Sequence, residues 1–136
     1  MQTLKQYHIL YINLDHRKDR KKYIETQLRN MNLMKRKKYT TKRISGVLGP
    51  DIHKNHIKLA KEFKVKPEQM NESFWLSRKN FKTMSNNKKK VMGRVGCFLA
   101  HLRALRYAIK KNLHNVIILE DDCTFIQNEH FKFPKP

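Results

Sequence analysis

Several features that would place the chain in a membrane or outside the cell are missing from the sequence. No apolar run approaches the roughly 20 residues that a membrane span requires. The apolar stretch within residues 1–14 follows a single lysine and leads to no small-residue cleavage site, so we expect no signal peptide. The two cysteines, Cys97 and Cys123, have neither zinc-binding nor redox spacing and should be reduced thiols. These absences predict a cytoplasmic protein.

Acidic residues are also scarce. Asp and Glu together number 11 against 31 Lys and Arg, which gives a formal net charge of +20. A field of this sign attracts nucleic acid, acidic membranes and phosphorylated metabolites alike. The basic residues are scattered, with short runs at 35–38 and 88–90, and a solvated surface accounts for each run. Charge alone therefore identifies no partner.

What the sequence does contain is enough for one small domain. Of its 136 residues 39% are hydrophobic, which supports a modest core and argues against wholesale disorder. No internal repeat or long low-complexity tract interrupts it. We therefore expect a single domain over residues 1–136.

The order of apolar patterns predicts an α/β fold. Residues 8–14 form a nearly continuous apolar run typical of a buried strand, Asp15 offers an N-cap, and helical spacing follows over 16–31. A second strand is expected over 39–44. We therefore expect a mostly parallel sheet with crossover helices.

The second half of the sequence continues the alternation. A helix is expected over 52–63, ended by Pro67, and 74–76 is expected to anchor an excursion on the core. The asparagines and lysines of 86–90 resemble an exposed loop, and a helix begins at Gly93. Its helically spaced apolar residues are Val95, Phe98, Leu99, Leu102, Leu105 and Ile109. A short buried strand follows at 116–119, and the prolines near the end argue against a further element.

The acidic triplet Glu120-Asp121-Asp122 comes directly after that last strand. In open α/β sheets ligands bind at the carboxyl ends of the strands. Alternation along an extended backbone places Glu120 and Asp122 on one side and Asp121 on the other. Two carboxylates on one face suit a hard divalent cation, although acids that pair with the many arginines are an equally good interpretation.

Four blocks in order resemble the family 25 glycosyltransferases. They are the strand-and-turn block 11–20 (YINLDHRKDR), the second-strand block 43–47 (RISGV), the helix block 93–102 (GRVGCFLAHL) and the acidic block 117–122 (IILEDD). The family includes lipopolysaccharide-building galactosyltransferases and enzymes that glycosylate hydroxylysine in collagen. The resemblance implies a GT-A type, Rossmann-like fold, a UDP-sugar donor and manganese.

The resemblance also implies roles for individual residues around the acidic triplet. Glu120 and Asp122 match the outer acids of a metal motif with Asp121 between them, and Asp122 is the foremost ligand. The tip of the first strand, Asn13, Leu14 and Asp15, is expected beside the nucleotide.

Further donor contacts are implied on the two helices. Arg17 and Arg20 are candidates for the diphosphate, with solvated helix residues as the alternative. Gly93 and Gly96 would let a helix start approach the donor, unless they serve turn geometry alone. His101 is a substrate contact or a structural histidine, and Ala100 stands where the family usually has serine.

The family's domain continues past the acidic motif, so the resemblance implies an incomplete GT-A fold, the donor-binding half. The general base that deprotonates an acceptor hydroxyl would lie in the other half, and we assign no catalytic residue. The expected function is transfer of galactose or glucose from a UDP-sugar to a glycan or hydroxylysine-type hydroxyl.

Two other interpretations stay open at this point. One is an inactive remnant of the domain. The other is a basic nucleic-acid-binding module, against which the aromatic residues are expected in the core: Tyr7, Tyr11, Phe74, Trp75 and Phe98. A sheet edge left unpaired would favour self-association or a second chain that completes the fold.

Overall fold

The computed structural model describes residues 6–34, 38–70 and 88–126. The chain divides into two compact units, one of residues 1–45 with 104–136 and one of residues 46–103. The predictions for 74–76, for 86–87 and for the proline-containing end at 131–136 lie outside the described residues.

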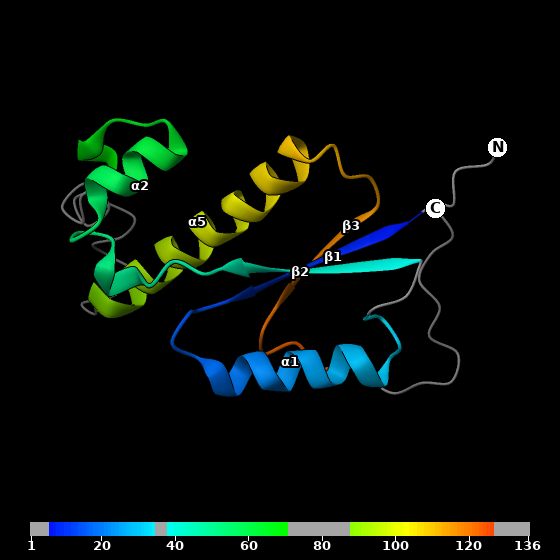
Figure 1. The fold of residues 1–136 in the computed structure, drawn as a ribbon. Helices are drawn as coiled ribbons and strands as arrows, with labels where there is room; N and C mark the ends of the chain where they lie inside the picture. Colours follow the sequence, from blue (N-terminus) through cyan, green and yellow to red (C-terminus); the bar gives the residue numbers. More distant parts are fainter. Residues whose placement is uncertain (1–5, 35–37, 71–87, 127–136) are drawn as a thin grey trace. The chain divides into compact units, whose positions relative to one another are not determined.

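A three-stranded parallel sheet organises the first unit. Its strands are β1 (Tyr7–Asn13), β2 (Tyr39–Ser45) and β3 (Val116–Glu120), in the order β2-β1-β3 (Figure 1). The central strand β1 is buried along almost its whole length, as its apolar run predicts. In the register, Asn13 pairs with Ser45 and Ile12 with Glu120, so the three carboxyl ends meet at one edge. The predicted α/β class with a parallel sheet is confirmed.

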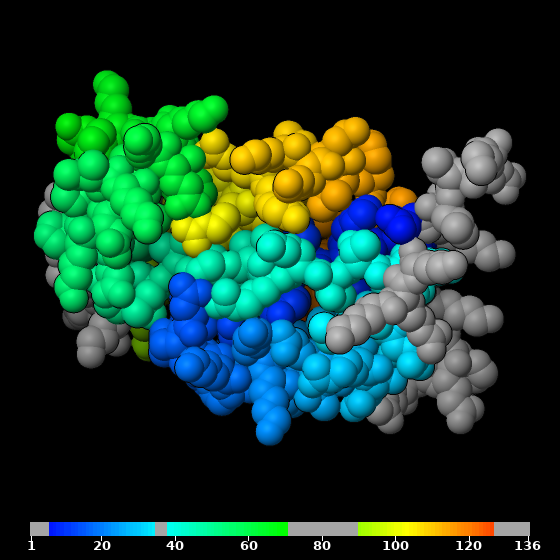
Figure 2. All heavy atoms as spheres, in the orientation of Figure 1, coloured from blue at the N-terminus to red at the C-terminus, as the bar shows by residue number. Residues whose placement is uncertain are grey.

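One face of this sheet is covered by α1 (Lys18–Asn30), whose close packing along the strands is visible in Figure 2. Ile24 and Leu28 are fully buried in a core with Ile9 and Tyr11 of β1. Of the apolar residues with helical spacing, Ile24 and Leu28 thus lie on the buried side as expected, whereas Tyr23 is 46% exposed.

The start of α1 differs from the prediction. Arg17, not Asp15, occupies the N-cap position, and no side chain caps the helix. The Asp15 carboxylate is engaged elsewhere, because it accepts hydrogen bonds from Arg43 and Ser45.

The second unit has its own core around short helices. It contains η1 (Gly49–Asp51), α2 (His56–Phe63), η2 (Pro67–Met70) and most of α5 (Lys88–Lys110). Buried residues of α2 and α5 share this core, among them Leu59, Phe63, Val95 and Leu99. The helix predicted from residue 52 begins only at His56, because Gly49-Pro50 sets a tighter 3₁₀ turn before it.

The helix expected to begin at Gly93 begins at Lys88 instead. Lysine is a good helix former, so the run read as a loop is the first turn of α5. Gly93 and Gly96 consequently lie inside the helix, where their N–H groups are not the free ones of a helix start.

The apolar stripe of α5 also needs correction. Val95 and Leu99 are buried, but Phe98, Leu105 and Ile109 are 58%, 49% and 79% exposed. The buried face instead carries small residues at four-residue spacing: Gly96, Ala100, Ala104 and Ala108. Small side chains permit close approach of a helix backbone to its neighbours, and the larger ones then turn outward. The expectation that Phe98 is a core aromatic was therefore wrong, whereas Tyr7 and Tyr11 are buried as expected.

A bidentate ion pair fixes α5 to α2 within the second unit. Arg103 donates from Nε and Nη2 to the two carboxylate oxygens of Glu62, the latter at 2.8 Å, and lies over the Phe63 ring. Within residues 6–34, 38–70 and 88–126, no helix is long and apolar enough to cross a bilayer.

Candidate functional site

The acidic triplet marks the carboxyl end of β3 and leaves the strand with alternating burial. Glu120 and Asp122 are exposed, whereas Asp121 is only 9% exposed. Burial alternates along these three positions, but the Asp121 and Asp122 carboxylates both lie near Arg20 Nη1, at 3.5 and 3.9 Å, so the placement of Glu120 and Asp122 on one side stays a prediction. The triplet therefore presents two carboxylates to solvent and one to the protein.

The buried carboxylate of Asp121 contacts Asn13, the last residue of β1. Asn13 is 2% exposed, and its Nδ2 donates to Asp121 Oδ2 at 2.8 Å and to the carbonyl of Arg17 at 3.0 Å. Its Oδ1 accepts from Arg43 Nε at 3.0 Å. Both amide donors and the amide oxygen are thus in use, as a buried side-chain amide requires.

The same guanidinium of Arg43 connects β2 to the end of β1. Besides the bond to the Asn13 side chain, its Nη2 donates to the Asn13 carbonyl at 3.1 Å and to the Asp15 carboxylate. Ser45 also donates to that carboxylate, at 2.8 Å. Asp15 is therefore held beside β2, while its side chain stays exposed to solvent.

Arg20 on α1 lies beside two acids of the triplet. Its Nη1 lies 3.5 Å from Asp121 Oδ1 and 3.9 Å from Asp122 Oδ2. The Arg20 side chain is 43% exposed, so water screens the attraction and each contact is weak. The structure thus brings Arg20 together with Asn13 and the acids, as a shared site requires.

Two predicted donor contacts have other local partners. Arg17 forms a bidentate pair with Asp19, with contacts of 2.9 and 2.7 Å, and this hydrogen bonding raises the pKa of Arg17 and lowers the pKa of Asp19. Leu14 serves the turn into α1, where its carbonyl accepts from the Arg17 N–H. The Nε and Nη2 donors of Arg17 are thus directed to Asp19.

The segment after the triplet is fixed to α1 by a row of side chains. Gln27 donates to the Cys123 carbonyl at 2.9 Å and accepts from the Phe125 N–H at 2.8 Å. Tyr23 shares a hydrogen bond of 2.7 Å with Thr124. With Arg20, these residues lie three and four positions apart, so one side of the helix contacts residues 121–125.

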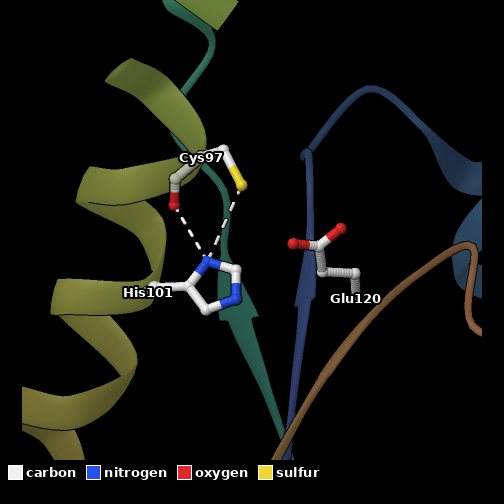
Figure 3. Close-up of side chains that lie close together, drawn as sticks. All are labelled: Cys97, His101 and Glu120. Carbon is white, nitrogen blue, oxygen red and sulfur yellow. Dashed lines mark hydrogen bonds between the residues drawn. The ribbon is translucent and has the colours of Figure 1, made fainter. Parts of the chain in front are cut away.

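The remaining predicted site residues belong to the second unit and have local surroundings there. His101 and Cys97 lie one turn apart on α5, and His101 Nδ1 is 3.0 Å from the Cys97 carbonyl and 3.7 Å from its sulfur (Figure 3). Among the described residues Gly93 has open space beside it, whereas Gly96 packs against the Val47 backbone. Gly96 thus permits a close approach to the protein's own chain, and the approach to a donor stays a prediction.

The donor set at the carboxyl edge fits a hard divalent cation. Glu120 and Asp122 offer exposed carboxylate oxygens from one strand end, which is the ligand type that such cations prefer. Asp121 differs, because its oxygens already face Asn13 and Arg20. Glu120 and Asp122 are therefore the carboxylates that would hold the cation, with open positions for other oxygen ligands.

Sequence reasoning missed Arg43 and Gln27. Arg43 lies within the matched second-strand block, but a charged residue in an edge strand usually indicates solvent exposure. The one signal for Gln27 was its spacing of seven residues from Arg20 on the same helix.

Comparisons with known proteins address the family directly. No curated protein and no solved structure matches the chain. A family model described as "Glycosyltransferase family 25 (LPS biosynthesis protein)" matches residues 6–133, which is nearly the whole sequence. The matched region includes the two strand ends and the acidic triplet that make up the site. The chain therefore belongs to glycosyltransferase family 25.

Proposed function

We propose that this member of the family uses a UDP-sugar donor with Mn²⁺ and transfers galactose or glucose to a hydroxyl of a glycan or a hydroxylysine-type acceptor. One observation carries the proposal. The exposed carboxylates of Glu120 and Asp122 stand at the carboxyl edge of a parallel sheet, beside the polar end of β1. Ligands of open α/β sheets bind at such edges.

In this proposal different residues at the carboxyl edge of the sheet bind the cation and the nucleotide of the donor. Glu120 and Asp122 hold the cation, and Leu14 and Asp15 after the tip of β1 lie beside the nucleotide. A divalent cation at this place neutralises the diphosphate leaving group as a Lewis acid. Arg20 adds positive charge on the α1 side, within reach of phosphate oxygens that approach the cation.

Titration calorimetry of UDP in the presence and absence of Mn²⁺ tests this proposal. UDP should bind with Mn²⁺ and at least about tenfold more weakly without it or after chelation with EDTA. Asp122→Asn should remove the metal-dependent part, because it deletes a charged ligand while it keeps the side-chain shape.

Glu68→Gln is the matched control, because it removes one negative charge from an exposed residue of η2. It should leave UDP affinity within about twofold of the wild-type value. Absence of UDP binding at millimolar Mn²⁺ would refute the proposed donor. Hydrolysis or transfer measured with UDP-galactose and UDP-glucose then identifies the sugar.

A further inference from the structure

The three acids of the triplet are not equivalent in their surroundings. Glu120 and Asp122 face solvent, whereas Asp121 is buried and accepts the Asn13 amide at 2.8 Å. Asn13 and Asp121 are 108 residues apart in sequence and join the ends of two neighbouring strands. A hydrogen bond between these ends fixes where the chain turns after β3.

The orientation of the Asn13 amide follows from its partners. Its Nδ2 faces two acceptors, Asp121 Oδ2 and the Arg17 carbonyl, while its Oδ1 faces the Arg43 donor. A flipped amide would bring an oxygen against two acceptor oxygens and an NH₂ against a guanidinium. Asn13 is therefore committed to protein contacts on both sides of its amide.

We propose that Asn13 is a positioning residue and that Asp121 is its anchor rather than a metal ligand, which leaves Glu120 and Asp122 as the carboxylates that bind the cation. The inference rests on the proposed function, since it concerns the same metal. It reassigns Asn13 from nucleotide contact to support of the acidic turn. Groups that orient metal ligands without touching the metal typically change its affinity about 10- to 100-fold when they are lost.

Three single substitutions separate a ligand from an anchor. Asp121→Asn, Asp122→Asn and Glu120→Gln each remove one negative charge from the triplet, so the general attraction for Mn²⁺ falls similarly in all three. The Asp121→Asn side chain still offers an oxygen to Asn13. We expect it to retain at least about tenfold higher Mn²⁺ affinity than either other variant, measured by calorimetry or by the electron paramagnetic resonance signal of free Mn²⁺.

A charge-conserving swap gives the sharper test. Asn13→Asp alone places two carboxylates in contact, which should lower both the midpoint of thermal unfolding and the Mn²⁺ affinity. The double variant Asn13→Asp, Asp121→Asn restores the donor and acceptor between the strand ends, although residue 13 then has no donor for the Arg17 carbonyl. We expect its Mn²⁺ affinity and its unfolding midpoint to recover partly, with an affinity several times higher than that of Asn13→Asp alone.

Each outcome bears on a distinct claim. The inference fails if the wild type binds Mn²⁺, Asp121→Asn loses as much Mn²⁺ affinity as Asp122→Asn, and the swap does not recover that affinity. Asp121 would then be a metal ligand, and the proposed function would stand. If the wild type binds no Mn²⁺ with or without UDP, both fail. Circular dichroism of every variant shows whether a loss of affinity accompanies a loss of fold, and the isosteric Asp121→Asn keeps the comparison decisive if Asn13→Asp does not fold.

Discussion

Two glycines one turn apart on α5 have opposite surroundings at the level of single atoms. A Cβ added to Gly96 would clash with the Val47 carbonyl oxygen, whereas one added to Gly93 would meet no atom of the described residues within 4 Å. Neither glycine has a positive φ, so alanine is acceptable to the backbone at both positions. The difference between them is packing alone.

The same substitution should therefore have opposite effects on stability. Gly93→Ala should raise the free energy of unfolding by about 0.5–1 kcal/mol, because alanine favours the helix. Gly96→Ala gains the same propensity but forces backbone apart, and overpacking of this kind costs about 1–3 kcal/mol, so a net loss is expected. Urea unfolding of both variants measures this, and stabilisation of both would contradict the packing of α5 on residue 47.

Cys123 is a partly buried thiol that directly follows the acidic triplet. Burial, and then the charge of Asp122, raise the pKa of Cys123. The thiolate is the reactive form, so the reaction of Cys123 with a disulfide reagent should be about tenfold or more slower than that of the exposed Cys97 near pH 8. Because the folded pKa is raised, its rate should keep rising with pH beyond the ordinary thiol range.

Single-cysteine variants make this measurable. In a Cys97→Ser background, Asp122→Asn should accelerate the reaction of Cys123, because a repelling charge has been removed. In urea both cysteines should react alike. Equal rates in the folded state would show that Cys123 is not shielded.

At the scale of elements, α1 supports the segment that follows the triplet. Gln27 makes two hydrogen bonds to the backbone of residues 123 and 125. Gln27→Leu loses both and should cost about 1–3 kcal/mol of stability, whereas Gln27→Glu keeps the acceptor for the Phe125 N–H and should cost less. Hydrogen exchange of the Phe125 amide should become faster in the same order.

The loss of the two Gln27 hydrogen bonds should also affect donor binding. If residues 121–125 set the position of Asp122, Gln27→Leu should also weaken Mn²⁺-dependent UDP binding, by about 10-fold as for other supporting groups. Thr26→Ala, at the exposed neighbouring position, is the control and should change neither property. Unchanged exchange at Phe125 in Gln27→Leu would refute the support role.

How far the sequence predicts these elements depends on the range of the interactions involved. The apolar run of β1 and the helical spacing of Ile24 and Leu28 are local patterns, and the structure confirms both. The burial of Asp121 relative to its neighbours also follows from strand alternation. In contrast, the partner of Asp121 lies 108 residues away, and no local pattern specifies it.

The errors in α5 have a related origin. Apolar spacing indicates which residues share a side of a helix, but the close contact of Gly96 with residue 47 decides which side is buried. The lysines at the start of the helix give no apolar signal, so the sequence predicts a loop where the structure has the first turn of α5. Long-range packing thus decides the buried side of α5, whereas the helix propensity of lysine favours its early start.

For the whole molecule, the net charge of +20 raises the competing prospect of nucleic-acid binding. Exposed Phe98 weakens one argument against it, since an exposed aromatic ring can stack on bases. The two functions differ in their salt dependence. Contacts to six or more phosphates lose about 10³-fold or more in affinity between 50 and 200 mM salt.

A nucleotide diphosphate bound through a metal involves fewer charges and closer ligands. We therefore expect Mn²⁺-dependent UDP affinity to fall by less than about tenfold over that salt range, while binding of a random single-stranded oligonucleotide, measured by fluorescence anisotropy, becomes undetectable. Phe98→Ala should leave UDP affinity unchanged. The opposite result would be an oligonucleotide affinity that exceeds the UDP affinity at 200 mM salt and drops severalfold in Phe98→Ala. It would make nucleic acid the physiological anion, because only base stacking retains its strength when the phosphate contribution is screened.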